Sequence, residues 1–350
     1  MKRQRISVLV LYNHSGSDEY EALRKIDRSS LDFTTKYDIH VATDAEEYDA
    51  IVLSLRAEGF SARAVNIRDD LQELNRLLKV NPPDVVFNLV EHWRDDPRLE
   101  EAVAGFFELH GVPFTGAPTF TLGLCRRKGL TKEILLQNGI ATPRYLVVHA
   151  PRVARRHGLR YPLIVKPARQ DASSGVTEKS VVHDYRGLVS QVERMITDFR
   201  PPVLVEEFLN GMELHVSILG NDPPEALPIV QFDFSELPAS HPPVITYDVK
   251  WSPLSLAYHR VHTYCPGRLS ARTQERVRRL ALRAYEATCC RDYARVDIRL
   301  DERGEPHVLE VNPNPNLTEG VSFMESAEKS GISFSQALKR IVDLALQRGR

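Results

Sequence analysis

The sequence places two carboxylates where two neighbouring β-strands are expected to face each other. The segments 295–300 and 307–312 alternate apolar and polar residues and are joined by a short loop, so they predict a β-hairpin. Its register sets Asp297 opposite Glu310, with Asn312 on the same face. Like charges opposite each other are destabilising by ~0.2–1 kcal/mol, so the two acids need a cation beside them. Oxygen ligands of this kind suit Mg²⁺, which commonly takes further ligands from nucleotide phosphates.

The same hairpin predicts one apolar face and one ionic face. The register starts with Leu300 opposite His307 at the end next to the loop, and it pairs Ile298 with Leu309 on the apolar face. Arg295 falls on the ionic face with the acids. An alternative is a solvent-facing hairpin whose acids pair with the arginines of the first strand.

A predicted strand ends in Lys166 and runs directly into a loop of small residues, 168–176. Ser173, Ser174 and Gly175 have little bulk, so backbone N–H groups can approach phosphate oxygens while the lysine supplies a positive charge. A surface hairpin with a serine-rich tip explains the same residues equally well.

A second predicted strand, within 203–213, emerges into acids, an aromatic residue and a turn. Phe208 and Leu209 can contact a flat base while main-chain groups bind its edge. Glu213 can accept hydrogen bonds from ribose hydroxyls. This composition is typical of a nucleotide hinge, and a solvated turn between strands is the simpler alternative.

Composition limits the class of protein. The 350 residues include 46 basic and 47 acidic side chains, without a long run of one sign, so small molecules rather than nucleic acid or a membrane are the expected partners. The four cysteines lack C-x-x-C spacing and no segment reaches the length of a membrane span. These features predict a cytoplasmic protein.

The chain is too long for one hydrophobic core. Its first third alternates predicted strands and helices, which indicates a small doubly wound α/β domain. We predict three parts, residues 1–118, 119–205 and 206–350. One continuous helix is expected over 122–138, a polar helix between two strands of the second part, and an irregular proline-rich stretch over 223–253.

The lysine-terminated strand, the hinge and the acidic hairpin, in this order, resemble the ATP-grasp superfamily and, most closely, D-alanine–D-alanine ligases. Three further segments resemble sequences of that family: D-V-V-F-N at 84–88, G-V-P-F-T-G at 111–116 and L-T-K-E-I-L-L-Q-N-G-I-A-T-P at 130–143. The resemblance implies an α/β (α+β) ATP-grasp fold behind an N-terminal Rossmann-like domain.

The resemblance also implies roles for individual residues. The expected ATP contacts are Lys128, Lys166, Ser173, Ser174, Gly175, Glu206, Glu207, Phe208, Leu209 and Glu213. The expected metal ligands are Asp297, Glu310 and Asn312. The expected catalytic residues are Arg295, Lys250, Tyr247 and Asn316. Tyr247 and Lys250 match the Y-x-x-K of a mobile loop that closes over the γ-phosphate.

The implied reaction is that of a carboxylate–amine ligase. A carboxylate attacks the γ-phosphate of ATP, and an amine displaces phosphate from the resulting acylphosphate to form an amide. The implied cofactors are ATP and Mg²⁺, with Mn²⁺ as a substitute, and the implied partners are a small-molecule carboxylate and amine, with a homodimer as the assembly. Charge stabilisation by the arginine and the metal would carry most of the catalysis.

Three segments depart from the family's pattern. The family's first domain opens with a glycine pair and an S-x-E segment, and residues 12–19 match this pattern only weakly. Residues 91–96 replace a glycine-rich loop, and Asn316 stands where the family has a glycine, with a serine expected beyond it near Val321 or Ser322. We therefore expect the ATP chemistry to be kept and the substrates to be other amino acids or small peptides.

Two other functions fit parts of the pattern: a non-ligating ATP-binding regulatory module and an ATP-grasp kinase for a small molecule. Arg295 together with three metal ligands favours the ligase over the module, since binding alone needs no residue matched to a transition state. His259 and His262 form an H-x-x-H in a proline-rich loop and are expected at the surface.

Overall fold

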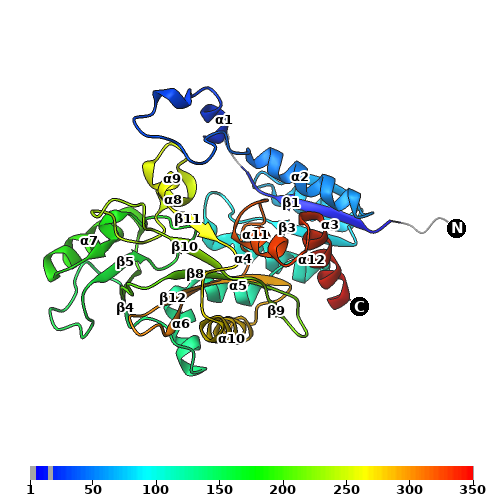
Figure 1. Ribbon diagram of the computed structural model, residues 1–350. Coiled ribbons are helices and arrows are strands. Elements are labelled where there is room, and N and C mark those ends of the chain that lie inside the picture. The colour runs from blue at the N-terminus through cyan, green and yellow to red at the C-terminus, as the bar shows by residue number, and fades with distance from the viewer. Residues whose placement is uncertain (1–4, 15–18, 350) are drawn as a thin grey trace.

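The structure of the chain, a computed structural model, describes residues 5–14 and 19–349, without the side chain of Glu19. The described residues form three β-sheets that lie in three parts of the molecule (Figure 1). Helices cover the sheets, so the expected α/β fold is confirmed.

The first sheet is parallel, with the order β2-β1-β3. Its strands are β1 (Ser7–Tyr12), β2 (Ser61–Asn66) and β3 (Val85–Leu89). Val8 and Val10 face the core under α2 (Asp44–Ala57), and Leu9 and Leu11 face the core under α3 (Leu71–Lys79) and α4 (Glu100–His110). Helices on both faces make this the predicted doubly wound unit.

The last two helices return to this first part. They are α11 (Ser322–Lys329) and α12 (Phe334–Arg348), and α12, red in Figure 1, packs against α2 and β3. Ile341 and Leu338 share one core with Val10 and Leu55. The N-terminal core therefore includes residues from the far end of the chain, a feature that the proposed division at residue 118 does not capture.

The second sheet has the order β4-β7-β5-β6 and antiparallel strands. The strands are β4 (Tyr145–Val148), β5 (Leu163–Pro167), β6 (Val181–Val182) and β7 (Val203–Glu207). The helix α7 (Tyr185–Phe199), capped by Asp184, packs on one face. The polar helix expected between the first two strands is absent from residues 149–162, which are described and irregular, apart from turns and bends.

The third sheet runs β11-β10-β8-β12-β13, with β9 paired to β8. Its strands are β8 (Glu213–Leu219), β9 (Glu225–Ala226), β10 (Val230–Asp233), β11 (His262–Tyr264), β12 (Tyr293–Leu300) and β13 (Pro306–Asn312). The long helix α10 (Ala271–Ala287) covers its apolar face. The strands β9 and β10 lie in the stretch 223–253, which was expected to be irregular.

The helix expected over 122–138 is broken into two. These are α5 (Thr119–Arg126) and α6 (Lys128–Gln137), and the break is at Arg127, whose ψ of 75° is not helical. The backbone N–H of Lys128 donates to the carbonyl of Ala168, 3.2 Å away. The prediction was wrong because this tertiary hydrogen bond replaces a helical one and sets Lys128 at the start of a new helix.

The acidic hairpin forms with the predicted register only at the end that carries the acids. Asp297 pairs with Glu310, but Ile298 pairs with Val308, because a β-bulge leaves Leu309 of β13 as one extra residue between the two partners. The predicted partnership of Ile298 with Leu309 is therefore wrong, as is the pairing of Leu300 with His307. The bulge lets Leu309 and Glu310 both face the pocket while Val308 stays in the core.

An excursion from the first part of the chain contacts the segment 247–260. It contains α1 (Glu19–Leu23) and the short η1 (Arg28–Ser30), and Figure 1 shows it in blue above α8 (Tyr247–Trp251) and α9 (Leu256–Arg260). The imidazole Nδ1 of His259 accepts from the backbone N–H groups of Lys36 and Tyr37, each at 3.1 Å. His259 is 1% exposed and His262 is 8% exposed, so the expected surface position was wrong for both.

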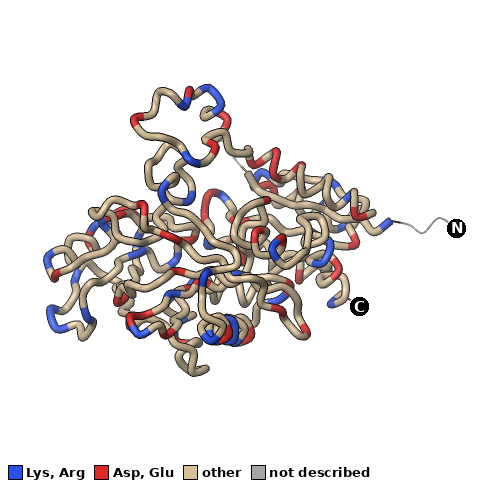
Figure 2. Tube along the Cα trace, viewed as in Figure 1, with Lys and Arg blue, Asp and Glu red and all other residues tan. Residues whose placement is uncertain are grey.

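Charged side chains of both signs are interspersed along the trace (Figure 2). Within residues 5–14 and 19–349, no helix has the length and apolarity needed to cross a membrane. The remaining short elements are η2 (Pro97–Leu99) and η3 (Glu178–Ser180).

Candidate active site

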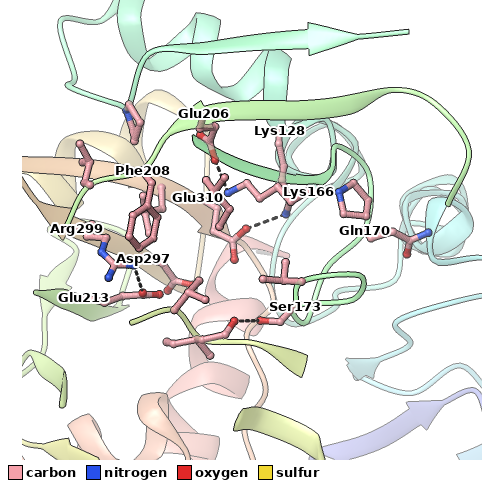
Figure 3. Close-up of a pocket in the computed structure, with 18 of the residues that line it drawn as sticks. Lys128, Lys166, Gln170, Ser173, Glu206, Phe208, Glu213, Asp297, Arg299 and Glu310 are labelled. Atoms are coloured by element: carbon pink, nitrogen blue, oxygen red, sulfur yellow. Dashed lines mark hydrogen bonds and ion pairs between the residues drawn. The ribbon is translucent and has the colours of Figure 1, made fainter. Parts of the chain in front are cut away.

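A pocket opens between the second and third sheets, and most of the predicted nucleotide-binding residues line it (Figure 3). The predicted residues in its lining are Lys128, Lys166, Ser173, Ser174, Glu206, Glu207, Phe208, Leu209, Glu213, Lys250, Asp297 and Glu310. Leu309, Ile164 and Val244 add an apolar side that the sequence did not single out. Residues from distant segments therefore converge on one site.

The two hairpin acids lie inside this pocket and each is paired with a protein cation. Arg295 donates from Nε and Nη2 to the two carboxylate oxygens of Asp297, at 2.7 and 2.9 Å. The ammonium of Lys128 lies 2.8 Å from Glu310. Asp297 is 4% exposed, so the solvent-facing alternative is wrong, although its pairing with Arg295 is present.

The surrounding cations keep both acids ionised. Burial raises the pKa of Glu310, but Lys128, Lys166 and Lys250 outweigh it and bring that pKa well below its ordinary value. The pKa of Asp297 is also lowered, by Arg295 against the effect of burial. The pocket thus holds two charged carboxylates at neutral pH.

Asp297 and Glu310 provide a set of metal ligands only when the side-chain amide of Asn312 is counted with them. The Nδ2 of Asn312 donates to Asp297 at 3.0 Å, which holds the amide beside that carboxylate. Among the described residues, no group of three or more His, Cys, Asp or Glu side chains is placed to hold an ion. Two carboxylates and one amide oxygen fit Mg²⁺, provided that phosphate oxygens supply further ligands.

A buried ion cluster positions one of the predicted phosphate lysines. Lys166 lies 2.6 Å from Glu206, and the other oxygen of Glu206 pairs with Lys132. Glu206 and Lys132 are each 1% exposed. Lys132 was missed, although it follows Lys128 by four residues and so shares its helix face, which is the signal that could have found it.

The hinge strand β7 points its two glutamates in opposite directions. Glu207 pairs with Arg144 and Arg160 at the molecular surface, whereas Glu206 faces the pocket. Glu207 therefore lines the pocket while its carboxylate points towards the two surface arginines.

The predicted ribose contact is held by Arg299, which the sequence analysis named only as an alternative partner of the hairpin acids. Arg299 donates to Glu213 at 2.9 Å, and its guanidinium lies 4.6 Å from the ring of Phe208 (Figure 3). Burial lowers the pKa of Arg299, and Glu213 opposes this effect. The pair fixes both the acid and the aromatic ring at one end of the pocket.

Hydrogen bonds connect the small-residue loop, residues 168–176, to the segment that was expected to form a mobile loop, around residues 245–251. Ser173 donates from Oγ to the carbonyl of Ile245 at 3.0 Å, and the Trp251 indole donates to the carbonyl of Ala172 at 2.9 Å. Gly175 lies outside the pocket lining, and its φ of +76° explains the glycine, because a Cβ there would also come within 3.0 Å of neighbouring side chains. Tyr247 is 44% exposed and lines neither this pocket nor the next.

A larger cavity of about 590 Å³ adjoins this pocket and shares Lys250 and His215 with it. The predicted residues Arg295, Asn312 and Asn316 line it, and Lys250 borders both spaces. Part of the segment that was expected to orient a first amino acid, residues 15–18, lies outside the described residues.

The walls of the cavity carry several acids and one buried arginine. Arg126 pairs with Glu100 and with Asp171, and Glu91 and Glu325 also line the space. Burial raises the pKa of Glu100 to about 8, with Arg126 opposing it. The sequence did not predict these residues, because they come from four separate segments.

His215 on β8 borders both spaces and was also missed. Its Nδ1 lies 3.1 Å from the Oγ of Ser322, and its Nε2 lies 3.6 Å from Oδ1 of Asp297. It is 2% exposed, and burial lowers its pKa to about 3. The imidazole is therefore neutral between the acidic hairpin and the cavity.

Fold and site together define a nucleotide-binding ligase of the ATP-grasp type. A family model described as the D-ala D-ala ligase C-terminus matches residues 134–343. The D-alanine–D-alanine ligase of Desulforudis audaxviator is 33% identical over 251 residues, which is 71% of this chain and 77% of that protein. The uncharacterized protein y4sG of Sinorhizobium fredii is 32% identical over 307 residues, 86% of this chain and 87% of its own.

Solved structures agree with this fold. The crystal structure of a D-alanine–D-alanine ligase from Bacillus anthracis complexed with ATP matches with a TM-score of 0.72 and 22% identity, over 99% of both chains. The chain belongs to the D-alanine–D-alanine ligase family. The expected superfamily is thereby confirmed, and so is the enzyme class of an ATP-dependent ligase that forms carbon–nitrogen bonds.

Proposed function

We propose that this enzyme uses ATP and Mg²⁺ to join the carboxylate of an amino acid or small peptide to an amine. The observation that carries the proposal is the junction of the two spaces. Lys250 and His215 border both, and Asp297 and Arg295 lie beside them. A triphosphate in the narrow pocket would thus meet a carboxylate in the cavity.

The pocket residues have distinct proposed tasks. Lys128 and Lys166 bind the phosphates nearer the nucleoside, since both ammonium groups are held by pocket carboxylates. Phe208, Leu209 and Glu213 bind the adenosine. Arg295 and Lys250 stabilise negative charge on the transferring group, where each such contact is worth ~3–4 kcal/mol in a site closed to water.

Asp297, Glu310 and Asn312 are the proposed ligands of Mg²⁺, the metal that this family uses with ATP. The metal would neutralise phosphate charge and orient the phosphoryl group for transfer. Lys128 and Arg295 now contact these carboxylates, so their cationic groups lie within reach of the same phosphates.

The cavity supports substrates larger than two alanines. Its volume of about 590 Å³ lies in the range of ~300–1,000 Å³ typical of pockets for drug-sized ligands. Two methyl side chains would leave much of this space to water. We further propose a cytoplasmic enzyme, because the four cysteines are free thiols; a homodimer is a prediction from the family resemblance alone.

The test is release of ADP and phosphate by the purified chain with a panel of amino acids and amines, with products identified by mass spectrometry. An amide product supports the ligase. ATP binding without turnover by any pair would instead support the regulatory module, and a stable phosphorylated product the kinase.

Variants of one hairpin connect the activity to this site. Glu310→Gln is expected to abolish turnover. Glu305→Gln, on the same hairpin but exposed and paired with Arg276, is expected to keep it. Full activity of Glu310→Gln would contradict the metal assignment.

A further inference from the structure

The cavity beside the nucleotide pocket is lined by more acids than cations. In the part of the chain that the structure describes, five carboxylates but only three lysine or arginine side chains line it. Two of these cations, Lys250 and Arg295, lie where the two spaces meet, because Lys250 borders both and Arg295 pairs with Asp297 of the nucleotide pocket. Of the three, Arg126 is therefore the cation that remains for the other walls.

Three of the acids form what we call the acidic wall: Glu91 after β3, Glu100 at the start of α4 and Asp171 in the small-residue loop. Glu100 and Asp171 both pair with Arg126, whereas Glu91 is exposed and makes no ion pair within the described residues. Burial raises the pKa of Glu100 to about 8, because Arg126 offsets the burial only in part. One guanidinium thus serves three carboxylates, and an ammonium group beside them would be attracted.

Arg126 also has hydrogen-bonding capacity that the protein does not use. Its side chain is 7% exposed, and its Nη2 donates to Glu100. Within residues 5–14 and 19–349, its Nε has no hydrogen-bond partner, and its Nη1 lies 2.7 Å from Asp171 without the geometry of a hydrogen bond. A buried N–H without an acceptor is costly, so an oxygen atom of a ligand would stabilise it. The neighbouring acids repel a carboxylate, so a neutral carbonyl oxygen fits best.

The cavity therefore has places for three different groups of one ligand. A carboxylate fits beside Lys250 and Arg295, a carbonyl oxygen beside Arg126, and an ammonium group beside the acidic wall. A peptide with a free N-terminus carries these groups in this order. A single amino acid carries its ammonium and carboxylate on one carbon atom, so it has no carbonyl between them. The volume of about 590 Å³ leaves room for the longer molecule.

We propose that the donor substrate, whose carboxylate is activated by ATP, is a short peptide with a free N-terminus. Arg126 binds its peptide carbonyl, and the acidic wall binds its terminal ammonium group. The inference rests on the proposed ligase function and names one of its two substrates. Arg126 and Glu91 are then the residues that select a peptide over a single amino acid.

Four achiral donors test the substrate class. Glycylglycine carries all three groups, 5-aminopentanoate replaces its peptide group by two methylenes, N-propanoylglycine replaces its ammonium by a methyl group, and glycine is the short donor. The full chain is assayed with ATP, Mg²⁺ and hydroxylamine. The hydroxylamine nitrogen bonds to the acyl carbon of the acylphosphate, loses a proton and displaces phosphate. The hydroxamate product therefore measures the donor independently of the natural amine.

We expect kcat/KM for glycylglycine to exceed that of each other donor by about tenfold or more, since each lacks at least one of the contacts. Glycine that reacts as well as glycylglycine overturns the inference but leaves the ligase function intact. Lysine that reacts better than glycylglycine also overturns it, in favour of a single amino acid with a cationic side chain. No hydroxamate with these donors or with any amino acid overturns both the inference and the ligase function.

A variant of Arg126 tests the contact with the carbonyl. Arg126→Lys keeps a cation between Glu100 and Asp171 but has no Nε–H. It should lower kcat/KM for glycylglycine by about tenfold and leave that for 5-aminopentanoate nearly unchanged, because only the peptide has the carbonyl. Equal losses with the two donors would show a structural role and refute the contact.

A variant of the acidic wall provides a second measurement at an exposed position. Glu91→Gln should lower kcat/KM for glycylglycine by about tenfold, but not that for N-propanoylglycine, and should leave the KM for ATP unchanged. Glu101→Gln is the matched control, because this glutamate of α4 pairs with Arg127 and lies outside the cavity lining. Equal effects of the two variants, or equal losses with both donors, would contradict the assignment of Glu91.

Discussion

Replacing Glu206 by glutamine takes one negative charge out of a cluster in which its carboxylate lies between two lysines. Lys166 is 2.6 Å from one oxygen and Lys132 pairs with the other. Glu206 and Lys132 are each 1% exposed, so water cannot replace the lost charge. Removing one member of a buried ion pair costs ~3–5 kcal/mol, chiefly because an uncompensated charge remains.

The structure places this variant near the lower limit of that range. Burial already lowers the pKa of Lys132, with Lys166 acting in the same direction and Glu206 against both. Without Glu206, Lys132 can lose its proton and so relieve part of the repulsion. We expect the free energy of unfolding to fall by about 3 kcal/mol. The KM for ATP should rise as well, because Lys166 loses the contact that positions it.

Two comparisons make the assay decisive. Glu207→Gln is the matched control, because this adjacent glutamate pairs with the exposed Arg144 and Arg160 and should cost much less. The double variant Lys132→Met with Glu206→Gln removes a cation together with the anion and should be more stable than Glu206→Gln alone. Urea denaturation measures all four proteins. Equal losses for the two glutamate variants, or a double variant no better than the single one, would refute the reasoning.

Three further outcomes are expected. Asp297→Ala should lower the free energy of unfolding by ~3–5 kcal/mol as well as abolish turnover, since Arg295, whose side chain is only 12% exposed, is left without its counterion; urea denaturation that matches the unsubstituted chain would contradict this. Burial lowers the pKa of His215 to about 3, so the folded state resists a proton that the unfolded state accepts. Stability should therefore fall as pH drops from 6.5 towards 3, by up to about tenfold in the folding equilibrium per pH unit, and His215→Leu should lose this component when denaturation is measured across that range. Gly211→Ala should raise the KM for ATP, because its Cβ would lie 2.2 Å from the carbonyl oxygen of Leu300 and displace the hinge from β12; an unaltered KM would show that the hinge tolerates the shift.

The hairpin shows what alternation can and cannot predict. Near the acids, alternating apolar residues specify which face is buried, so Asp297 and Glu310 were correctly paired. Nearer the loop, Val308 and Leu309 are consecutive apolar residues and the core takes only the first. A bulge satisfies both the core and the pocket, but its position depends on packing that a single strand does not encode.

The missed residues have a common cause. Lys132, Arg299 and His215 lie two to four residues from predicted site residues, yet their roles depend on partners from other segments. His259 was expected at the surface because its loop is rich in proline, whereas an excursion from the first domain buries it. Local patterns predict which strand carries an acid, but not which distant backbone covers a histidine.

The return of α12 to the first sheet has a consequence for synthesis of the protein. Val10 and Leu55 emerge early from the ribosome, but Leu338 and Ile341, which belong to the same core, are made much later. Until then the nascent chain exposes the apolar surface that α12 covers in the folded protein. The first domain of this ligase thus reaches its native packing only once α12 has been made, and chaperones that bind apolar segments have the intervening elongation time in which to act on it.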